Sequence, residues 1–242
     1  TNGYFSHGYG MKAKGMAGAA TATHDDAFFG ANNPAAAAFA GNRMDLGVDL
    51  FMPIREASRA GSTGNPMIPP AGTPPLDGTS ESDSEYFLIP EFGYNRMVNS
   101  NLALGVTVYG NGGMNTDYAG DQVPSQSACA SFNPTPGPYN LMCGNGRLGV
   151  DLTQLMIAPY AAMKLSPGHS LGIAPVIAYQ RFKAEGLQAF DNPMLSTSMG
   201  SVTNNGYSDA WGAGVRIGYM GEFSKQFSVG AAYATKINMG EF

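Results

Sequence analysis

Charged residues, cysteine and long apolar runs are all scarce in this sequence. Only 13% of its 242 residues are charged, against roughly 25% in an average soluble domain. No stretch approaches the roughly 20 apolar residues that a transmembrane helix needs, which excludes helical membrane spans. The 13 Lys and Arg residues are scattered and outnumbered by 18 Asp and Glu, so the sequence predicts no nucleic-acid partner.

Motifs for catalysis are missing as well. The three histidines, His7, His24 and His169, lie far apart, and no nucleophile elbow, zinc-protease motif or phosphate-binding loop occurs. We therefore expect no enzyme, no cofactor and no metal site. The sequence HDD at residues 24–26 could bind a metal or begin a helix, and we favour helix capping by its aspartates.

Two cysteines, Cys129 and Cys143, lie in a stretch rich in Gly, Pro, Ser and Asn. A disulfide between them would stabilise the loop by roughly 3 kcal/mol on the chain-entropy model and would indicate an oxidising compartment. Two free thiols are the alternative. Metal binding is disfavoured because the thiols are far apart and no histidine is near.

Alternation of apolar and polar residues is what the sequence does contain. In RMDLGVDLFMPI, residues 43–54, apolar side chains occupy every second position from Met44 to Ile54. A period of two predicts a β-strand with one apolar face. That face would meet a second protein layer in a soluble β-sandwich, and lipid in an outer-membrane barrel.

Six further segments alternate in the same way. They are residues 86–96, 102–110, 150–164, 171–183, 210–223 and 226–236. Within the segment 150–164 the apolar phase shifts between Leu152 and Leu155, which predicts either a bulge or an early part above the bilayer.

The connections between these segments alternate between short and long. The short ones are residues 98–101, 166–169 and 224–226, and the long ones are 56–84, 111–147 and 184–207. Periplasmic turns and long extracellular loops give this pattern in outer-membrane barrels. We therefore predict an all-β fold, a transmembrane antiparallel barrel over residues 43–242. Since seven strands is an odd number and bacterial barrels close with an even one, we expect an incomplete barrel.

Residues 1–42 do not alternate and mix Ala-rich stretches with turn residues. Such a partly helical segment before the first strand could act as a hatch that plugs the lumen. A periplasmic tail is the alternative.

Five stretches carry a resemblance to a known family: SHGYGMKAKGMAGA, DDAFFGANNPAAAAF, NRMDLGVDLF, VYGNGGMNTDY and GVDLTQLMIAPYAAMKLSPGHSLGIAPVIAYQRFKAEGLQAF. In this order they resemble the FadL-type outer-membrane transporters of long-chain fatty acids, which include TodX-like importers of aromatic hydrocarbons. The resemblance implies a monomeric 14-stranded barrel in the outer membrane of a Gram-negative bacterium, surrounded by lipid and lipopolysaccharide, with about the first half present here. It also implies passive uptake of hydrophobic molecules from an extracellular pocket, past a hatch, to a lateral opening. The hatch motif falls on Asp25, Asp26, Asn33, Pro34 and Ala35.

Apolar residues in the long loops could line the ligand pocket, because each buried CH₂ of a ligand contributes about 0.8 kcal/mol and methionine adapts to varied apolar shapes. The candidates are Met114, Tyr118, Phe132, Leu141, Met142, Phe190 and Met194. The alternative is that these side chains only hold the loops together.

Glycines at the end of the third strand are candidates for the lateral exit. Gly110, Asn111, Gly112 and Gly113 follow a regular alternation, and glycine inside a strand marks a bulge or kink. In the family, the third strand bends inward and leaves a gap facing the membrane, and by position Gly110–Gly113 form that kink or lie just above it. An ordinary strand-to-loop turn is the alternative.

Basic residues could bind an anionic head group of the ligand. By alternation Arg216 and Lys236 fall on lumen faces, and Arg181 and Lys183 lie near an extracellular strand end. An ion pair with Asp or Glu is the commoner role for such residues, so the charge of the ligand stays undecided.

The leading hypothesis is a passive outer-membrane transporter of hydrophobic molecules such as long-chain fatty acids or aromatic hydrocarbons. The alternative from another class is a non-transporting surface protein, an adhesin or structural barrel. A soluble β-sandwich is the third hypothesis.

Overall fold

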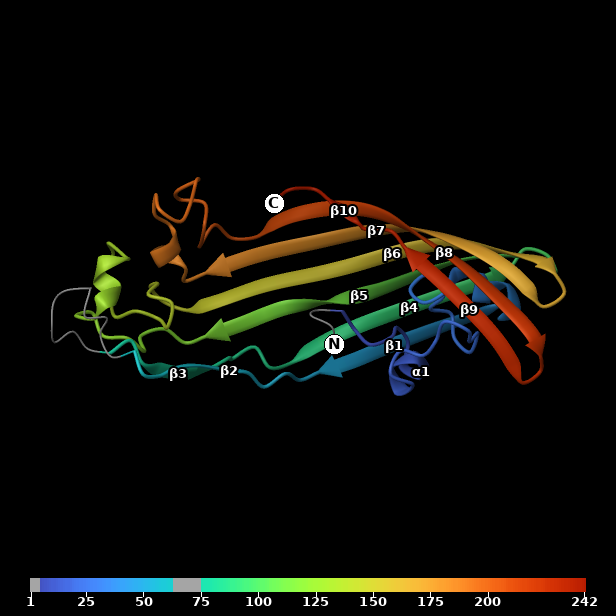
Figure 1. Cartoon of the computed structure of the whole chain (residues 1–242), viewed down its shortest axis with the longest axis horizontal. Coiled ribbons are helices and arrows are strands. Elements are labelled where there is room, and N and C mark those ends of the chain that lie inside the picture. The colour runs from blue at the N-terminus through green and yellow to red at the C-terminus, as the bar shows by residue number, and fades with distance from the viewer. Residues whose placement is uncertain (1–4, 63–74) are drawn as a thin grey trace.

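The computed structural model describes residues 5–62 and 75–242, except for the surroundings of Gly112, and shows one long, curved antiparallel sheet (Figure 1). The sheet forms a half-barrel. Its strand order is β1, β4, β5, β6, β7, β8, with both β9 and β10 pairing with the far side of β8. The strands are β1 (Arg43–Phe51), β4 (Phe87–Met97), β5 (Leu102–Tyr118), β6 (Leu148–Ser166), β7 (His169–Glu185), β8 (Ser208–Ser224), β9 (Phe227–Ala234) and β10 (Asn238–Met239).

Each alternating segment of the sequence coincides with one of these strands, although β1 ends at Phe51 and β9 at Ala234, before the predicted ends. The long connections gather at one end of the sheet (Figure 1). Two predicted loop boundaries are wrong, because backbone pairing continues through polar residues. The loop predicted at 56–84 contains a second sheet of β2 (Glu56–Arg59) and β3 (Gly78–Glu81), although residues 63–74 lie outside the described part. The loop predicted from residue 111 begins only after β5 ends at Tyr118.

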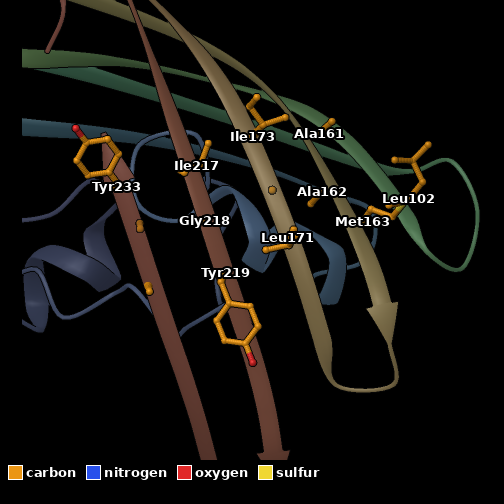
Figure 2. Close-up of a pocket in the computed structure, with 13 residues that line it drawn as sticks. Leu102, Ala161, Ala162, Met163, Leu171, Ile173, Ile217, Gly218, Tyr219 and Tyr233 are labelled. Atoms are coloured by element: carbon orange, nitrogen blue, oxygen red, sulfur yellow. The ribbon is translucent and has the colours of Figure 1, made fainter. Parts of the chain in front are cut away.

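The apolar rows of the strands form an exposed surface, which we call the outer face. Leu46 is 76% exposed, Trp211 61% and Ile217 50%. An apolar groove of about 640 Å³ lies on this face, with Leu171, Ile217 and Tyr233 among its walls (Figure 2). Since no second layer of described residues covers these rows, the β-sandwich hypothesis is wrong.

The opposite, inner face carries the N-terminal segment, residues 5–42. This segment contains α1 (Met11–Gly15) and the 3-10 helix η1 (Pro34–Phe39). Ala35 to Ala38 are buried against β6, β7 and β8, and Phe29 meets Tyr160 of β6 edge-on at 5.9 Å between ring centroids. In the part of the chain that the structure describes, no helix has the length and apolar character to cross a membrane.

Asn33 fixes η1 to the sheet. Its side-chain oxygen caps η1 by accepting the Ala35 N–H at 3.1 Å, and its amide group donates to the carbonyls of Thr21 at 2.7 Å and Tyr219 at 2.9 Å. Pro34 supplies the helical φ of the first position. A Cβ at residue 218 would lie 1.9 Å from the Asn33 Oδ1, so this close approach requires Gly218.

The prediction that the aspartates of HDD begin a helix is wrong. Asp26 accepts the Phe28 N–H at 3.1 Å within a turn, and Asp25 contributes only its carbonyl, which accepts from Lys12 Nζ at 2.8 Å. Burial raises the pKa of Asp26. No group of metal-binding side chains occurs among the described residues.

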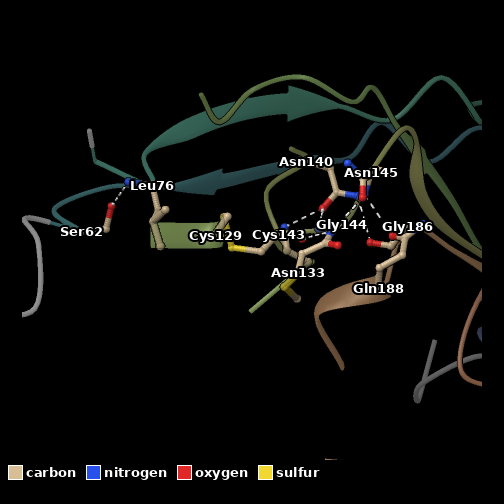
Figure 3. The surroundings of a disulfide bond; sticks show 11 residues. Ser62, Leu76, Cys129, Asn133, Asn140, Cys143, Gly144, Asn145, Gly186 and Gln188 are labelled. Atoms are coloured by element: carbon tan, nitrogen blue, oxygen red, sulfur yellow. Dashed lines mark hydrogen bonds between the residues drawn. A yellow bond between two sulfur atoms is a disulfide. The ribbon is translucent and has the colours of Figure 1, made fainter. Parts of the chain in front are cut away.

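The long loops pack into a small core of their own. Cys129 and Cys143 form the expected disulfide, in contact with buried Tyr139 and Leu141. Figure 3 shows how Asn140 joins this loop to the one after β7: its amide donates to the Gly186 carbonyl at 2.9 Å. The short helices η2 (Ala128–Ser131) and η3 (Gln188–Phe190) lie in these loops.

Replacing Asn33 by Ala should undock η1, because three hydrogen bonds to buried groups disappear. We expect a loss of about 2–4 kcal/mol in the free energy of unfolding and faster proteolysis within residues 5–42 at unchanged cleavage of the strands. Asn32→Ala, which removes one bond to the Tyr9 carbonyl at 2.9 Å, should have a smaller effect. Equal protease resistance of both variants would contradict this role of Asn33.

Candidate functional site

The candidate site begins at a bulge in β5. Gly110 pairs with Leu155 of β6 and Gly113 pairs with Thr153, so β5 has one extra residue here. The pairing of β6 with β7 is uninterrupted from the pair Gly149–Glu185 to the pair Ile157–Ile177. The bulge therefore lies on β5 and not on β6 at 152–155 as one reading of the phase shift predicted, and the glycines are not a strand-to-loop turn.

The polarity of both faces changes at the level of this bulge. Because the register of β6 is unbroken, Leu152 and Gln154 share the inner face, whereas Thr153 and Leu155 share the outer face. Above the bulge, that is, toward the long loops, four apolar residues lie together on the inner face, and we call this surface the inner wall: Met114, Val150, Leu152 and Phe182. Thr116 and Ser208 lie beside them on the same face. The outer face above the bulge is polar, with Asp151, Thr153, Arg181, Lys183 and Asp209.

A buried row of amides, which we call the amide row, separates the inner wall from the N-terminal segment. Tyr9 donates its hydroxyl proton to the Asn111 carbonyl oxygen, Asn111 donates to Gln154 at 3.0 Å, and Gln154 donates to Gln180 at 2.7 Å. Burial raises the pKa of the Tyr9 phenol, so Tyr9 stays a hydrogen-bond donor. The amide row thus links the N-terminal segment to β5, β6 and β7.

Glu91 of β4 makes a second connection to the N-terminal segment. Its buried carboxylate accepts the Gly10 N–H at 2.9 Å and the Lys14 ammonium group at 2.5 Å, and Lys14 also pairs with Asp49 of β1 at 3.1 Å. Glu91 and Tyr109 are also the uppermost pair of the β4–β5 ladder. Helix α1 is therefore anchored beside the point where β4 and β5 stop pairing.

Above that pair the ladder between β4 and β5 is interrupted, and we call this stretch the seam. The residues Phe87 to Pro90 pair with β1, with no partner on β5 among the described ladders. Pairing on this side of β5 resumes where the Asp83 N–H donates to the Asp117 carbonyl at 2.9 Å. Just below, the Arg55 guanidinium group donates to the carbonyls of Asn115 and Ser84.

The four basic candidates do not converge. Arg216 faces inward and donates to the Gly30 carbonyl at 3.1 Å, so the ion pair expected for it does not form among the described residues. Lys236 is exposed between β9 and β10. Arg181 lies on the outer face, as does Lys183, which pairs with Glu185 at 3.0 Å.

The seven pocket candidates are not brought together either. Met114 and Tyr118 lie on the inner face of β5, and Leu141 is buried in the loop core. The others are exposed on loops: Phe132, Met142, Phe190 and Met194. Sequence reasoning missed Val150, Leu152 and Phe182 because they follow the shifted apolar phase, which was the available signal.

Comparison with known proteins gives structural matches alone, since no family model and no curated protein matches the sequence. The toluene transporter TodX of Pseudomonas putida matches with a TM-score of 0.66 at 18% identity, over 98% of this chain and 57% of TodX. A FadL homologue of Pseudomonas aeruginosa matches with a TM-score of 0.59 at 16% identity, over 97% and 53%. A deltaS2S3 mutant of TodX, described as a monoaromatic hydrocarbon channel, gives 0.67 at 18% identity, over 96% and 56%.

The chain has the fold of the FadL/TodX-type channels. The resemblance predicted from the sequence is thus confirmed for the fold, and the chain spans about half the length of these neighbours. Their names describe transporters and channels rather than enzymes.

Asn111→Ala should loosen the first residues of the N-terminal segment, because Tyr9 and Gln154 both lose a buried partner. We expect about 1–3 kcal/mol of destabilisation, with faster hydrogen exchange at the Gly10 amide. Asn115→Ala is the matched control, as its side chain lies four residues further along β5 on the outer face. Identical exchange at Gly10 in both variants would show that the amide row does not hold the segment.

Proposed function

We propose that this chain is part of an outer-membrane channel that admits hydrophobic molecules by passive diffusion. The observation that carries the proposal is the change in polarity at the β5 bulge. An apolar inner wall above a sealed polar layer is a suitable binding surface for an apolar solute, and it has no use in a barrel that merely spans the membrane. In this proposal residues 1–42 are the hatch and residues 43–242 are the first half of the barrel.

The outer face supports a position in the outer membrane of a Gram-negative bacterium, as a monomer surrounded by lipid and lipopolysaccharide. On β8, Trp211 and Tyr219 bracket the apolar outward residues between them. These eight residue steps cover about 26 Å along the strand, or about 20 Å in height at a tilt of about 40°. An apolar band flanked by aromatic residues is what a membrane barrel presents to lipid.

The proposed route starts at the loops and follows the inner wall. Binding there gains about 0.8 kcal/mol for each buried CH₂ group. The amide row and the hatch block the way straight down, so the solute leaves sideways through the seam beside Gly110–Gly113. The end of the β4–β5 ladder at Glu91 supports this exit, because the wall there lacks the backbone hydrogen bonds that hold it closed elsewhere.

The cargo class follows from the same surfaces. Two neighbours are named for toluene and monoaromatic hydrocarbons and another as a FadL homologue, which supports aromatic hydrocarbons or long-chain fatty acids for this chain too. Arg216 is engaged by Gly30, and Arg181 and Lys183 face outward. Apolar contact therefore contributes most of the binding in this half of the barrel.

Leu152→Gln in the full-length protein should reduce uptake several-fold, because it places an amide on the inner wall. Uptake of radiolabelled toluene and oleate by cells that express the protein measures this. Thr153→Gln is the matched control, since it places the same side chain one residue further on, on the outer face. Normal uptake with Leu152→Gln would favour the non-transporting surface barrel.

Gly113→Val should slow uptake while the barrel still assembles. A Cβ at residue 113 would lie 2.3 Å from the Leu152 carbonyl oxygen, so the bulge has to shift. We expect a similar effect for a bulky residue at position 112. Asn115→Val, two residues further along β5 on the outer face, should leave uptake unchanged. An uptake rate equal to that control would remove the seam from the route.

A further inference from the structure

Arg181 and Lys183 lie on the outer face, away from the inner wall, so they do not contact a solute that follows that wall. Both are outward residues of β7: in the strand register Arg181 lies opposite Asp209 of β8, and Lys183 lies opposite Asp151 of β6. The transported solute does not meet this surface in the proposed route. A ligand for these cations has to approach from outside the barrel.

Their height on the barrel is set by the aromatic pair directly below. Tyr179 and Trp211 lie with their ring centroids 4.9 Å apart on the outer face, and the Tyr179 hydroxyl donates to Asp209 at 2.7 Å. Arg181 follows two residues later, about 7 Å further along the strand. Aromatic residues of this kind mark the boundary between acyl chains and head groups, so Arg181 lies at head-group level.

Tyr207 holds both cations in one place. Its ring lies 3.8 Å from the Arg181 guanidinium carbon and 5.3 Å from Lys183 Nζ, and its hydroxyl donates to Asp151 at 2.6 Å. An aromatic face that orders two cations preorganises them for a single anion.

Arg181 still has free binding capacity. The three nearby carboxylates are engaged, Asp151 by Tyr207, Asp209 by Tyr179 and Glu185 by Lys183. The Arg181 guanidinium group donates a hydrogen bond to the Tyr207 hydroxyl. Among the described residues it makes no ion pair with a carboxylate, and its Nε has no hydrogen-bond partner. A planar guanidinium group with unused donors matches two oxygens of a phosphate.

We propose that Arg181, Lys183 and Tyr207 form a binding site for a phosphate group of an outer-leaflet lipid, namely lipid A. The site rests on the proposed membrane position of the outer face and is independent of transport. Lys183 leaves Glu185 to contact the phosphate, Arg181 binds it with its fork of N–H groups, and the acyl chains continue down over Tyr179 and Trp211.

Titration of the purified full-length protein in detergent with lipid A, followed by native mass spectrometry, tests the site. The double variant Arg181→Gln with Lys183→Gln should bind lipid A at least about ten-fold more weakly, and Tyr207→Leu should also weaken binding. Arg96→Gln is the matched control, because Arg96 is also an exposed outward cation but lies on β4 beside a short turn, at the end of the sheet away from the long loops. Heat-modifiable electrophoretic mobility verifies that each variant is folded.

Lipid A without phosphate groups and inorganic phosphate are the two further probes. We expect the dephosphorylated lipid to bind equally weakly to wild type and double variant, and inorganic phosphate not to compete at millimolar concentration, since it lacks acyl chains. Equal affinity of wild type and double variant for lipid A, or no phosphate dependence, would overturn the site. Uptake of toluene by the double variant should equal that of wild type, so a failed lipid site leaves the transport proposal intact.

Discussion

The continuous register between the loop-side halves of β6 and β7 is the constraint on which the rest of the structure depends. A strand has a period of two, so a single missing or extra residue would move every later side chain to the other face. The register does not shift between the pair Gly149–Glu185 and the pair Ile157–Ile177. The residue types alone therefore decide which side chains each face presents. Leu152 and Ile177 are both apolar, yet the first faces inward and the second outward. The change in polarity therefore results from the order of apolar and polar residues along β6 and β7, and not from a kink in these two strands.

Close packing of the N-terminal segment against the inner face follows from residue size. Ala35 to Ala38 are buried against the sheet, and at Gly172 a Cβ would lie 2.4 Å from the Ala35 nitrogen. Small residues on both sides let a short 3-10 helix approach the strands almost at backbone distance. At that distance the carbonyls of η1 need partners from the strands, and Ser170 and Asn95 supply them at 2.8 Å and 3.0 Å. Apolar packing and polar anchoring are thus two consequences of one close approach.

Much of this fold could be predicted from the sequence, because a strand with one exposed apolar row shows a strict alternation of apolar and polar residues. One example is the outward row of β1, whose side chains are more than half exposed, so that their polarity rather than a close fit selects them: Met44, Leu46, Val48 and Leu50. The resemblance to FadL-type transporters added the N-terminal segment and its Asn33. The inner wall could not be predicted from the loops, where the apolar residues were sought, because Leu152 and Phe182 lie on strands. Gln154 and Gln180 could not be recognised as partners, since their contact depends on the register of two strands 26 positions apart.

The position of the buried charges bears on the lateral exit that we propose. A buried ion pair such as Glu91 with Lys14 contributes little net stability, since desolvation offsets much of the attraction, but it penalises any arrangement that separates the two charges. Here the pair fixes α1 against β4 at the last rung of the β4–β5 ladder. Below this rung, backbone hydrogen bonds and the docked segment both close the wall. Above it, β4 has no described rung with β5, and Arg55 bridges the carbonyls of Asn115 and Ser84. A side chain can move out of such a bridge without unpairing a strand, which is why we propose the seam as the exit.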